Sequence, residues 1–201
     1  MMVTTHALVG LLIALPVVFF APDHAPVALA AGVAGGILPD FDVVATHRKT
    51  FHAPVVAAGG AIAALPLALL SPSALTIALA VFLAAAALHC YGDVLSCGLG
   101  ARPWENPPSD RAVFDHVRGR WVPPRRVIPY DGSPEDLAIA GVLAVPLLFT
   151  LEGQWELLVS GLLVVSIGYT VSRKRLEHVA CWGVRFLPAG LRRYVPERYL
   201  V

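Results

Sequence analysis

Residues 37–54 read ILPDFDVVATHRKTFHAP and bring carboxylate, imidazole and basic side chains together in one short stretch. Long runs of Ala, Val, Leu and Gly flank this stretch on both sides. Charged groups in an apolar setting are costly unless they are compensated, and a bound cation and solvation in a loop are the two simplest forms of compensation. The stretch therefore predicts either a cation site or a solvated loop.

A second polar pair lies in the motif LHCYGD, in which His89 and Asp93 are four residues apart. This spacing puts both side chains on one face of a helix, one turn apart. The apolar run AVFLAAAAL precedes the motif, so we expect the pair at or just inside a membrane, where ionisable residues are candidates for a functional site. A His–Asp hydrogen bond that only neutralises the two groups is the alternative interpretation.

The His and Asp residues that border apolar segments suit a metal site. Imidazole and carboxylate are the usual non-thiolate ligands of zinc, and mixed sets of the two also suit Mn and Fe. The set is large enough for one or two divalent ions, of which zinc is the expected one. Its members are His6, Asp40, Asp42, His47, His52, His89 and Asp93. Cys90, Cys97 and Cys181 form no CxxC motif and are not expected to be ligands.

The composition indicates that membrane helices position these residues. The chain is 57% hydrophobic and 14% charged, with a mean hydropathy of +0.69, whereas soluble domains are about 45–50% apolar and about 25% charged. The formal net charge of +1 gives no reason to expect direct nucleic-acid binding. No Lys or Arg precedes the first apolar segment, so we interpret that segment as a retained membrane helix rather than a secretory signal.

Apolar segments predict an all-α fold, an integral membrane helical bundle of about six transmembrane or membrane-embedded helices. A straight span needs about 20 residues, so the shorter segments need extension through flanking polar residues or burial inside the protein. Four or five helices are the alternative counts. The segments cover residues 7–21, 27–38, 53–70, 74–95, 137–151 and 157–171.

The basic residues predict the orientation of these helices. All 15 Lys and Arg residues fall in the polar stretches 39–52, 96–136 and 172–201, on one side of a six-span bundle. By the positive-inside rule, both termini and these stretches face the cytoplasm, which places every candidate ligand at the cytoplasmic edge of a multi-pass protein of the cell (inner) membrane.

Three regions follow from this topology. Residues 1–100 form a four-helix membrane region with the candidate metal site, residues 101–136 a cytoplasmic loop rich in Arg, Pro and Trp, and residues 137–201 two further helices and a basic cytoplasmic tail. The Arg residues of the loop could attract anionic lipid headgroups, and a solvated positive-inside loop is the alternative.

The order of the motifs resembles that of a known family. The early His6, LPDFD, HRKTFH and HCYGD are similar to the early His, PDxD, HRxxTH and HxxxD of the membrane-bound, metal-dependent hydrolases typified by YdjM, over residues 1–100. That family is in turn similar, at a distance, to zinc-dependent phospholipase C and the P1-type nucleases, whose HxxxE motif is not visible here. The resemblance implies metal-binding roles for His6, Asp40, His52, His89 and Asp93, with His47 as a further ligand.

Asp42 and Arg48 are the candidate catalytic residues. The guanidinium of Arg48 can hold an anionic oxygen through two parallel hydrogen bonds. We therefore expect a membrane-bound, metal-dependent hydrolase, surrounded by membrane lipids, that acts on a phosphoester of a lipid or other amphiphile, the substrate class coming from the distant resemblance. The alternatives are a non-enzymatic metal or ion transporter, and a regulatory or structural membrane protein that binds a partner through its cytoplasmic segments.

Overall fold

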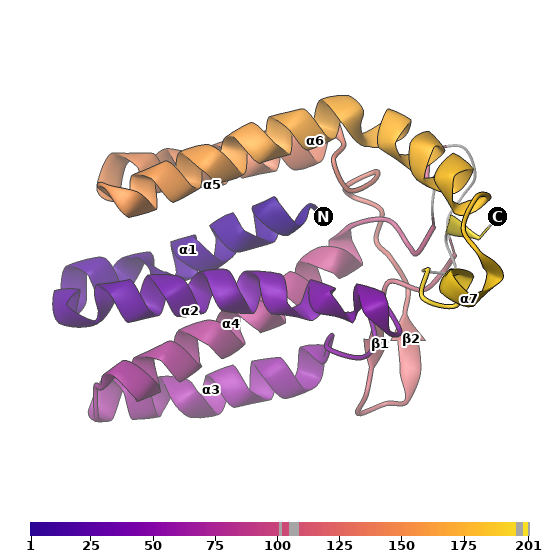
Figure 1. Cartoon of the computed structure of the whole chain (residues 1–201). Coiled ribbons are helices and arrows are strands. Elements are labelled where there is room, and N and C mark those ends of the chain that lie inside the picture. The colour runs from indigo at the N-terminus through magenta and orange to yellow at the C-terminus, as the bar shows by residue number, and fades with distance from the viewer. Residues whose placement is uncertain (101, 105–108, 196–198, 201) are drawn as a thin grey trace.

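The computed structural model describes residues 1–100, 102–104, 109–195 and 199–200. In these residues, longer helices run side by side and make up most of the molecule (Figure 1). They are α1 (Val3–Phe20), α2 (Ala25–Ile37), α3 (Pro54–Leu70), α4 (Ala74–Leu95), α5 (Pro134–Thr150) and α6 (Gln154–Val184). The predicted helical fold is thereby confirmed, and α6 continues well beyond the apolar segment that predicted it.

Shorter elements lie between and after these helices. The 3-10 helices η1 (Pro22–His24) and η2 (Leu38–Val44) flank α2, and the short helix α7 (Ala189–Arg192) follows α6. Strands β1 (Val113–Asp115) and β2 (Arg120–Val122) pair antiparallel in the long polar stretch. No strand was predicted there from the sequence, because strands of three residues are too short to show an alternation of polar and apolar positions.

Four helical segments of the described chain are long and apolar enough to cross a membrane. They are α1, the segment Pro22–Val44 that contains α2, α4, and α6, whereas α3 is apolar but shorter. Large apolar side chains such as Phe20, Leu70 and Phe149 are 85–88% exposed. Exposed apolar surface of this kind is compatible with lipid contact. The count of six spans stays a prediction.

Glycines let the backbones of α1 and α2 lie close together. A Cβ atom at Gly10 would collide with the backbone of Gly32, and one at Gly36 would collide with the carbonyl group of His6. Small residues allow membrane helices to approach each other in this way. The contact at Gly36 places the end of α2 directly beside His6, at the end of the bundle that carries the candidate ligands.

Asp136, at the start of α5, holds the beginning of α1. Its buried carboxylate accepts hydrogen bonds from the N–H of Met2 at 2.7 Å, the hydroxyl of Thr5 at 2.8 Å and the N–H of Gly132 at 3.1 Å. Buried carboxylates need such donors, because an unpaired charge away from water is strongly disfavoured. His6 follows directly on Thr5, so this anchor also fixes its position.

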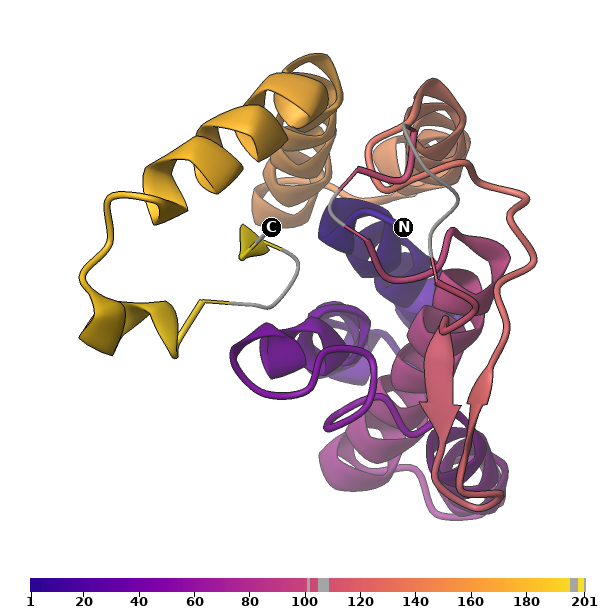
Figure 2. The same ribbon diagram turned by 90° about the vertical axis from the view of Figure 1, so that its right-hand side faces the viewer.

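The polar segments gather at one end of the bundle. The N-terminus, η2, the β1–β2 hairpin and the chain after α6 lie toward the same end in Figure 1, and Figure 2 views the molecule from that end. The turns that join α1 to α2, α3 to α4, and α5 to α6 lie at the opposite end. This arrangement agrees with the predicted separation of basic from non-basic connections, while the side that faces the cytoplasm stays a prediction.

Candidate metal centre

Two histidines and two aspartates meet in one cluster at the polar end of the bundle. Asp40 comes from η2, His52 precedes α3, and His89 and Asp93 lie near the end of α4. One ligand atom from each residue lies within 4.8 Å of the other three. Both histidines and Asp93 are buried, and the side chain of Asp40 is 24% exposed. The structure thus brings four of the predicted ligands together.

His89 has one ring nitrogen committed to the backbone. Its Nδ1 lies 2.7 Å from the carbonyl oxygen of Gly36, and because a carbonyl oxygen only accepts, Nδ1 carries a proton and donates. In the neutral ring Nε2 then has a free lone pair, and it lies 3.4 Å from Oδ1 of Asp40 and 3.6 Å from Oδ2 of Asp93. A backbone carbonyl that fixes the tautomer in this way is typical of metal-binding histidines.

His52 is oriented in the same way by Asp42. Its Nδ1 donates to Oδ2 of Asp42 at 2.9 Å, and its Nε2 lies 3.2 Å from both Oδ2 of Asp93 and Nε2 of His89. Burial acts to lower the pKa of His52, but the hydrogen bonds with Asp42 and Asp93 outweigh burial, and the pKa is raised. The surroundings of His52 therefore favour a positive charge, carried either by the ring or by a bound cation.

The distances between the four ligand atoms fit a single tetrahedral ion. Zinc–ligand distances of about 2.0–2.2 Å in a tetrahedron separate neighbouring ligand atoms by about 3.3–3.6 Å. Five of the six separations run from 3.2 Å between the two Nε2 atoms to 3.8 Å between Nε2 of His52 and Oδ1 of Asp40. The sixth, between the carboxylate oxygens of Asp40 and Asp93, is at most 4.8 Å. Because the nitrogen lone pairs and the carboxylates also point at one another, the residues present fit a divalent cation.

His6 of α1 lies against this cluster but contacts the other oxygen of Asp93. Its Nε2 is 3.2 Å from Oδ1 of Asp93, and its ring stacks on that of His89 with the centroids 3.8 Å apart. The amino group of Met1 lies 3.0 Å from the same Oδ1. His6 could therefore be a ligand only of an ion bound to Oδ1 of Asp93, whereas His52 and His89 lie near Oδ2 of Asp93.

Asp42, one of the two candidate catalytic residues, is fully buried and faces the turn that follows it. Both of its oxygens are occupied by protein donors. The donors are Nδ1 of His47 at 2.8 Å, Nδ1 of His52, and the N–H groups of Arg48, Lys49 and Phe51. His47 is thereby directed at Asp42, and the structure does not bring it into the four-residue cluster.

Arg48, the other candidate catalytic residue, reaches the edge of the cluster. Its φ of 60° lies in the left-handed region that non-glycine residues rarely adopt, and its carbonyl accepts a hydrogen bond from the N–H of Phe114 in β1 at 2.9 Å. Nη1 donates to the carbonyl of Cys97 at 2.8 Å, and Nε lies 3.4 Å from Oδ2 of Asp93. The hairpin therefore helps to hold the guanidinium beside the cluster.

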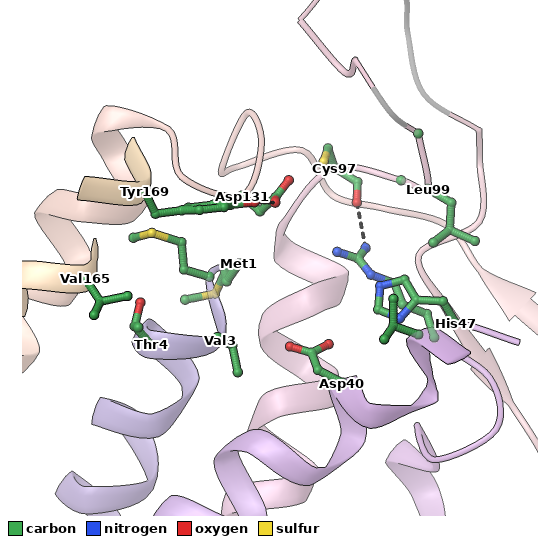
Figure 3. Close-up of a pocket in the computed structure, with 15 residues that line it drawn as sticks. Met1, Val3, Thr4, Asp40, His47, Cys97, Leu99, Asp131, Val165 and Tyr169 are labelled. Carbon is green, nitrogen blue, oxygen red and sulfur yellow. Dashed lines mark hydrogen bonds between the residues drawn. The ribbon is translucent and has the colours of Figure 1, made fainter. Parts of the chain in front are cut away.

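A pocket of about 290 Å³ opens next to this guanidinium. Figure 3 shows walls from the N-terminal end of α1, from η2 and the turn after it, and from α6. Its lining includes Val3, Asp40, His47, Arg48, Leu99, Asp131, Val165 and Tyr169. A molecule in the pocket would meet Asp40 and Arg48 together. The wall from α6 was not predicted from the sequence, because that helix carries no motif and lies far along the chain.

A second buried polar cluster ties the loop before α5 to α6. Arg173, which is 3% exposed, donates to both carboxylate oxygens of Asp131 and to Glu177 at 2.9 Å. The hydroxyl of Tyr169 donates to Asp131 at 2.6 Å. From the sequence, Arg173 was predicted only to be a basic residue of the tail, because nothing in the run RKR indicates that one of its residues is buried. Both carboxylates accept hydrogen bonds from Arg173, so we assign this cluster a structural role.

Comparisons of the chain with protein-family models, with curated proteins and with solved structures gave no match. The resemblance to the YdjM-like hydrolases therefore stays a prediction from the motifs.

Proposed function

We propose that this protein is a membrane-bound, metal-dependent hydrolase that cleaves a phosphoester at the cytoplasmic edge of the inner membrane. One observation carries the proposal. His52 and His89 each commit Nδ1 to a protein acceptor and turn Nε2 toward the other histidine and toward two aspartates in a buried cluster. Such a set of acceptors is stable only around a positive charge. We propose zinc as the ion, since imidazole and carboxylate ligands in a tetrahedron suit it, with Mn or Fe as alternatives.

The residues beside the cluster support an anionic substrate. A divalent ion held by the cluster would polarise a phosphoryl oxygen and lower the pKa of water. Arg48 adds a second positive group at the wall of the pocket, and a planar guanidinium binds phosphate oxygens well. Asp42 and the carbonyl of Gly36 keep His52 and His89 in the orientation of ligands. Arg48 is therefore the residue that binds the substrate, and Asp42 is a positioning residue that orients His52.

The setting supports a substrate that is presented at a membrane. The four candidate ligands lie where the helical segment Pro22–Val44 and the helix α4 end, and both segments are long and apolar enough to be spans. We propose six spans with the polar end in the cytoplasm, because the basic residues of the chain are confined to the polar stretches. Membrane lipids then surround the bundle, and a phosphoester of a lipid or other amphiphile is the substrate class within reach.

Metal content and activity of the purified protein test the proposal. We expect zinc to copurify and the protein to hydrolyse p-nitrophenyl phosphate or its diester. His89→Ala removes a ligand and Asp93→Asn removes the charge that holds the cation, so each should lower metal affinity by about 100-fold or more and abolish hydrolysis. The measurements are metal analysis by mass spectrometry and release of nitrophenol.

The matched control is His178→Ala, which removes an exposed histidine of α6 and should leave metal content and hydrolysis unchanged. A double variant, His89→Leu with Asp93→Leu, decides between the two interpretations of the pair. If the pair only neutralises itself, apolar replacement should be neutral or stabilising and should change neither metal content nor activity. That result would reject the hydrolase.

A further inference from the structure

The pocket beside the cluster has the size of a site for a small group. Its volume is about 290 Å³, which is at the lower limit of the range of about 300–1,000 Å³ that small-molecule sites occupy. A whole lipid with two chains is too large for it. A head group and the first part of one alkyl chain fit this volume, provided that the rest of the chain can pass out of the pocket between two of its lining residues.

The polar end of the pocket is built around Arg48. The side chain is 9% exposed, and its Nε lies 3.4 Å from Oδ2 of Asp93 without a hydrogen-bond partner among the residues that the structure describes. Arg48 lines the pocket, and its guanidinium has more N–H donors than the one at Nη1 that binds the carbonyl of Cys97, so an oxygen atom of a ligand in the pocket can accept a hydrogen bond from this group. Asp131 also lines the pocket, but its oxygens accept hydrogen bonds from Arg173 and Tyr169, so its charge is already compensated.

The apolar end of the pocket reaches the outer surface of the helices. Val3 of α1 and Val165 of α6 both line the pocket, and they are 40% and 57% exposed. Figure 3 shows these two side chains on the side of the pocket away from His47, with Asp40 between the two sides. The neighbouring Val164 is 68% exposed and does not line the pocket. The apolar wall therefore continues into the surface that faces lipid if α1 and α6 are spans.

We propose that this pocket binds the head group of a single-chain anionic amphiphile, whose alkyl chain passes between two residues of the apolar wall. The phosphate or phosphonate end accepts hydrogen bonds from Arg48, and the alkyl chain leaves between Val3 and Val165 into the membrane. The inference rests on the proposed function for the membrane setting and names the substrate class of the same site. It assigns Arg48 to the head group and Val165 to the chain.

Binding of phosphonates to the protein in phosphatidylcholine nanodiscs tests this assignment. The probes are methylphosphonate and decylphosphonate, which are not hydrolysed, and empty nanodiscs measure how much decylphosphonate enters the bilayer alone. We expect decylphosphonate to bind at least about tenfold more tightly after that correction. Arg48→Met should weaken both probes by about ten- to hundredfold. Val165→Trp should abolish the advantage of the long chain, because the indole fills the apolar end.

Val164→Trp is the matched control, since it adds the same side chain one residue away, outside the pocket, and should keep the advantage. Equal affinity for both probes in the wild type would overturn the proposal and leave a site for free phosphate. An equal effect of the two tryptophan variants would overturn it as well, because the effect would then come from the helix surface. Phosphonate binding without any hydrolase activity would reject the proposed hydrolase and leave the amphiphile site standing. Hydrolysis of soluble esters without chain-dependent binding would reject the amphiphile site and leave the proposed hydrolase standing.

Discussion

Asp42 shows how a carboxylate can support a candidate metal site without being one of its ligands. All of its hydrogen bonds go to the turn that follows it, including the one to Nδ1 of His52, whose other nitrogen points into the cluster. A carboxylate that accepts from a ligand histidine fixes the ring and raises its basicity. A general base, by contrast, must keep an oxygen within reach of a substrate proton. The geometry therefore favours the positioning role.

Asp42→Asn distinguishes these two roles. Because donors converge on both oxygens, an amide group in either orientation sets an N–H₂ against at least two of them. We expect the free energy of unfolding to fall by about 1–3 kcal/mol and the zinc affinity to fall by about 10–100-fold. The measurements are thermal unfolding and zinc titration, with Asp23→Asn, an exposed aspartate at the opposite end, as the control. An unchanged zinc affinity with lost activity would instead make Asp42 the general base.

The candidate ligands could be predicted from the sequence, whereas the roles of the groups that orient them, Asp42 and the carbonyl of Gly36, could not. His6, Asp40, His52, His89 and Asp93 all border apolar segments at one predicted membrane edge, and the structure brings them together. The contact between the carbonyl of Gly36 and His89 could not be predicted, because every residue has a carbonyl group and only the fold determines its direction. Likewise His47 was grouped with the ligands by type, although its ring binds Asp42.

At the scale of elements, the site depends on how closely α2 approaches α1 and α4. A Cβ atom at Gly35 would collide with the carbonyl of Phe82 in α4, as one at Gly36 would with the carbonyl of His6 in α1. The end of α2 therefore fits between two helices that both carry candidate ligands. Its last turns also deliver the carbonyl that orients His89.

Gly36→Ala should disturb packing and site together. The added methyl group must push α1 away from α2, which we expect to cost about 1–3 kcal/mol of unfolding free energy and to weaken zinc binding as the carbonyl of residue 36 moves. Gly59→Ala in α3 is the control, because a Cβ atom there meets nothing within 4 Å. We expect it to be neutral or stabilising by up to about 1 kcal/mol. Thermal unfolding and zinc titration measure both variants, and equal behaviour of the two would contradict the close packing.

The elements themselves were predicted to different degrees. Apolar runs located the six longer helices, because long continuous runs leave few alternatives to a helix. The β1–β2 hairpin and the course of the loop were not predicted, since they depend on contacts between distant residues, such as the N–H of Phe114 and the carbonyl of Arg48. The burial of Arg173 escaped prediction for the same reason.

At the scale of the whole molecule, the candidate ligands lie at one end of the bundle, and the connections at the other end, residues 21–24, 71–73 and 151–153, contain no Lys or Arg. The candidate ligands, the pocket and the β1–β2 hairpin all belong to the polar end, as Figures 1 and 2 show for the elements that carry them. An even number of spans is the simplest way to keep every basic stretch on one side of a membrane.

Labelling of single introduced cysteines tests this topology. Val117→Cys lies in the hairpin, where the native side chain is 66% exposed, and Glu152→Cys lies in the turn between α5 and α6. A membrane-impermeant maleimide should label only Glu152→Cys in intact cells and both variants after permeabilisation. The three native cysteines are buried, and the wild type measures their background. Labelling of Val117→Cys in intact cells would overturn the six-span orientation.

The hydrogen bond between Phe114 and Arg48 makes the hairpin a partner of the pocket. It supports a backbone conformation that Arg48 would otherwise rarely adopt, and the ammonium group of Lys49 lies 4.3 Å from the centroid of the Phe114 ring. Two events that stabilise one conformation favour each other by the same free energy, whichever comes first. A ligand bound at Arg48 would therefore make opening of the hairpin less favourable, and a molecule bound to the outer face of the hairpin would strengthen the binding of that ligand. Hydrogen exchange at the Phe114 amide, measured with and without the ligand, reports how far the ligand suppresses opening of the hairpin.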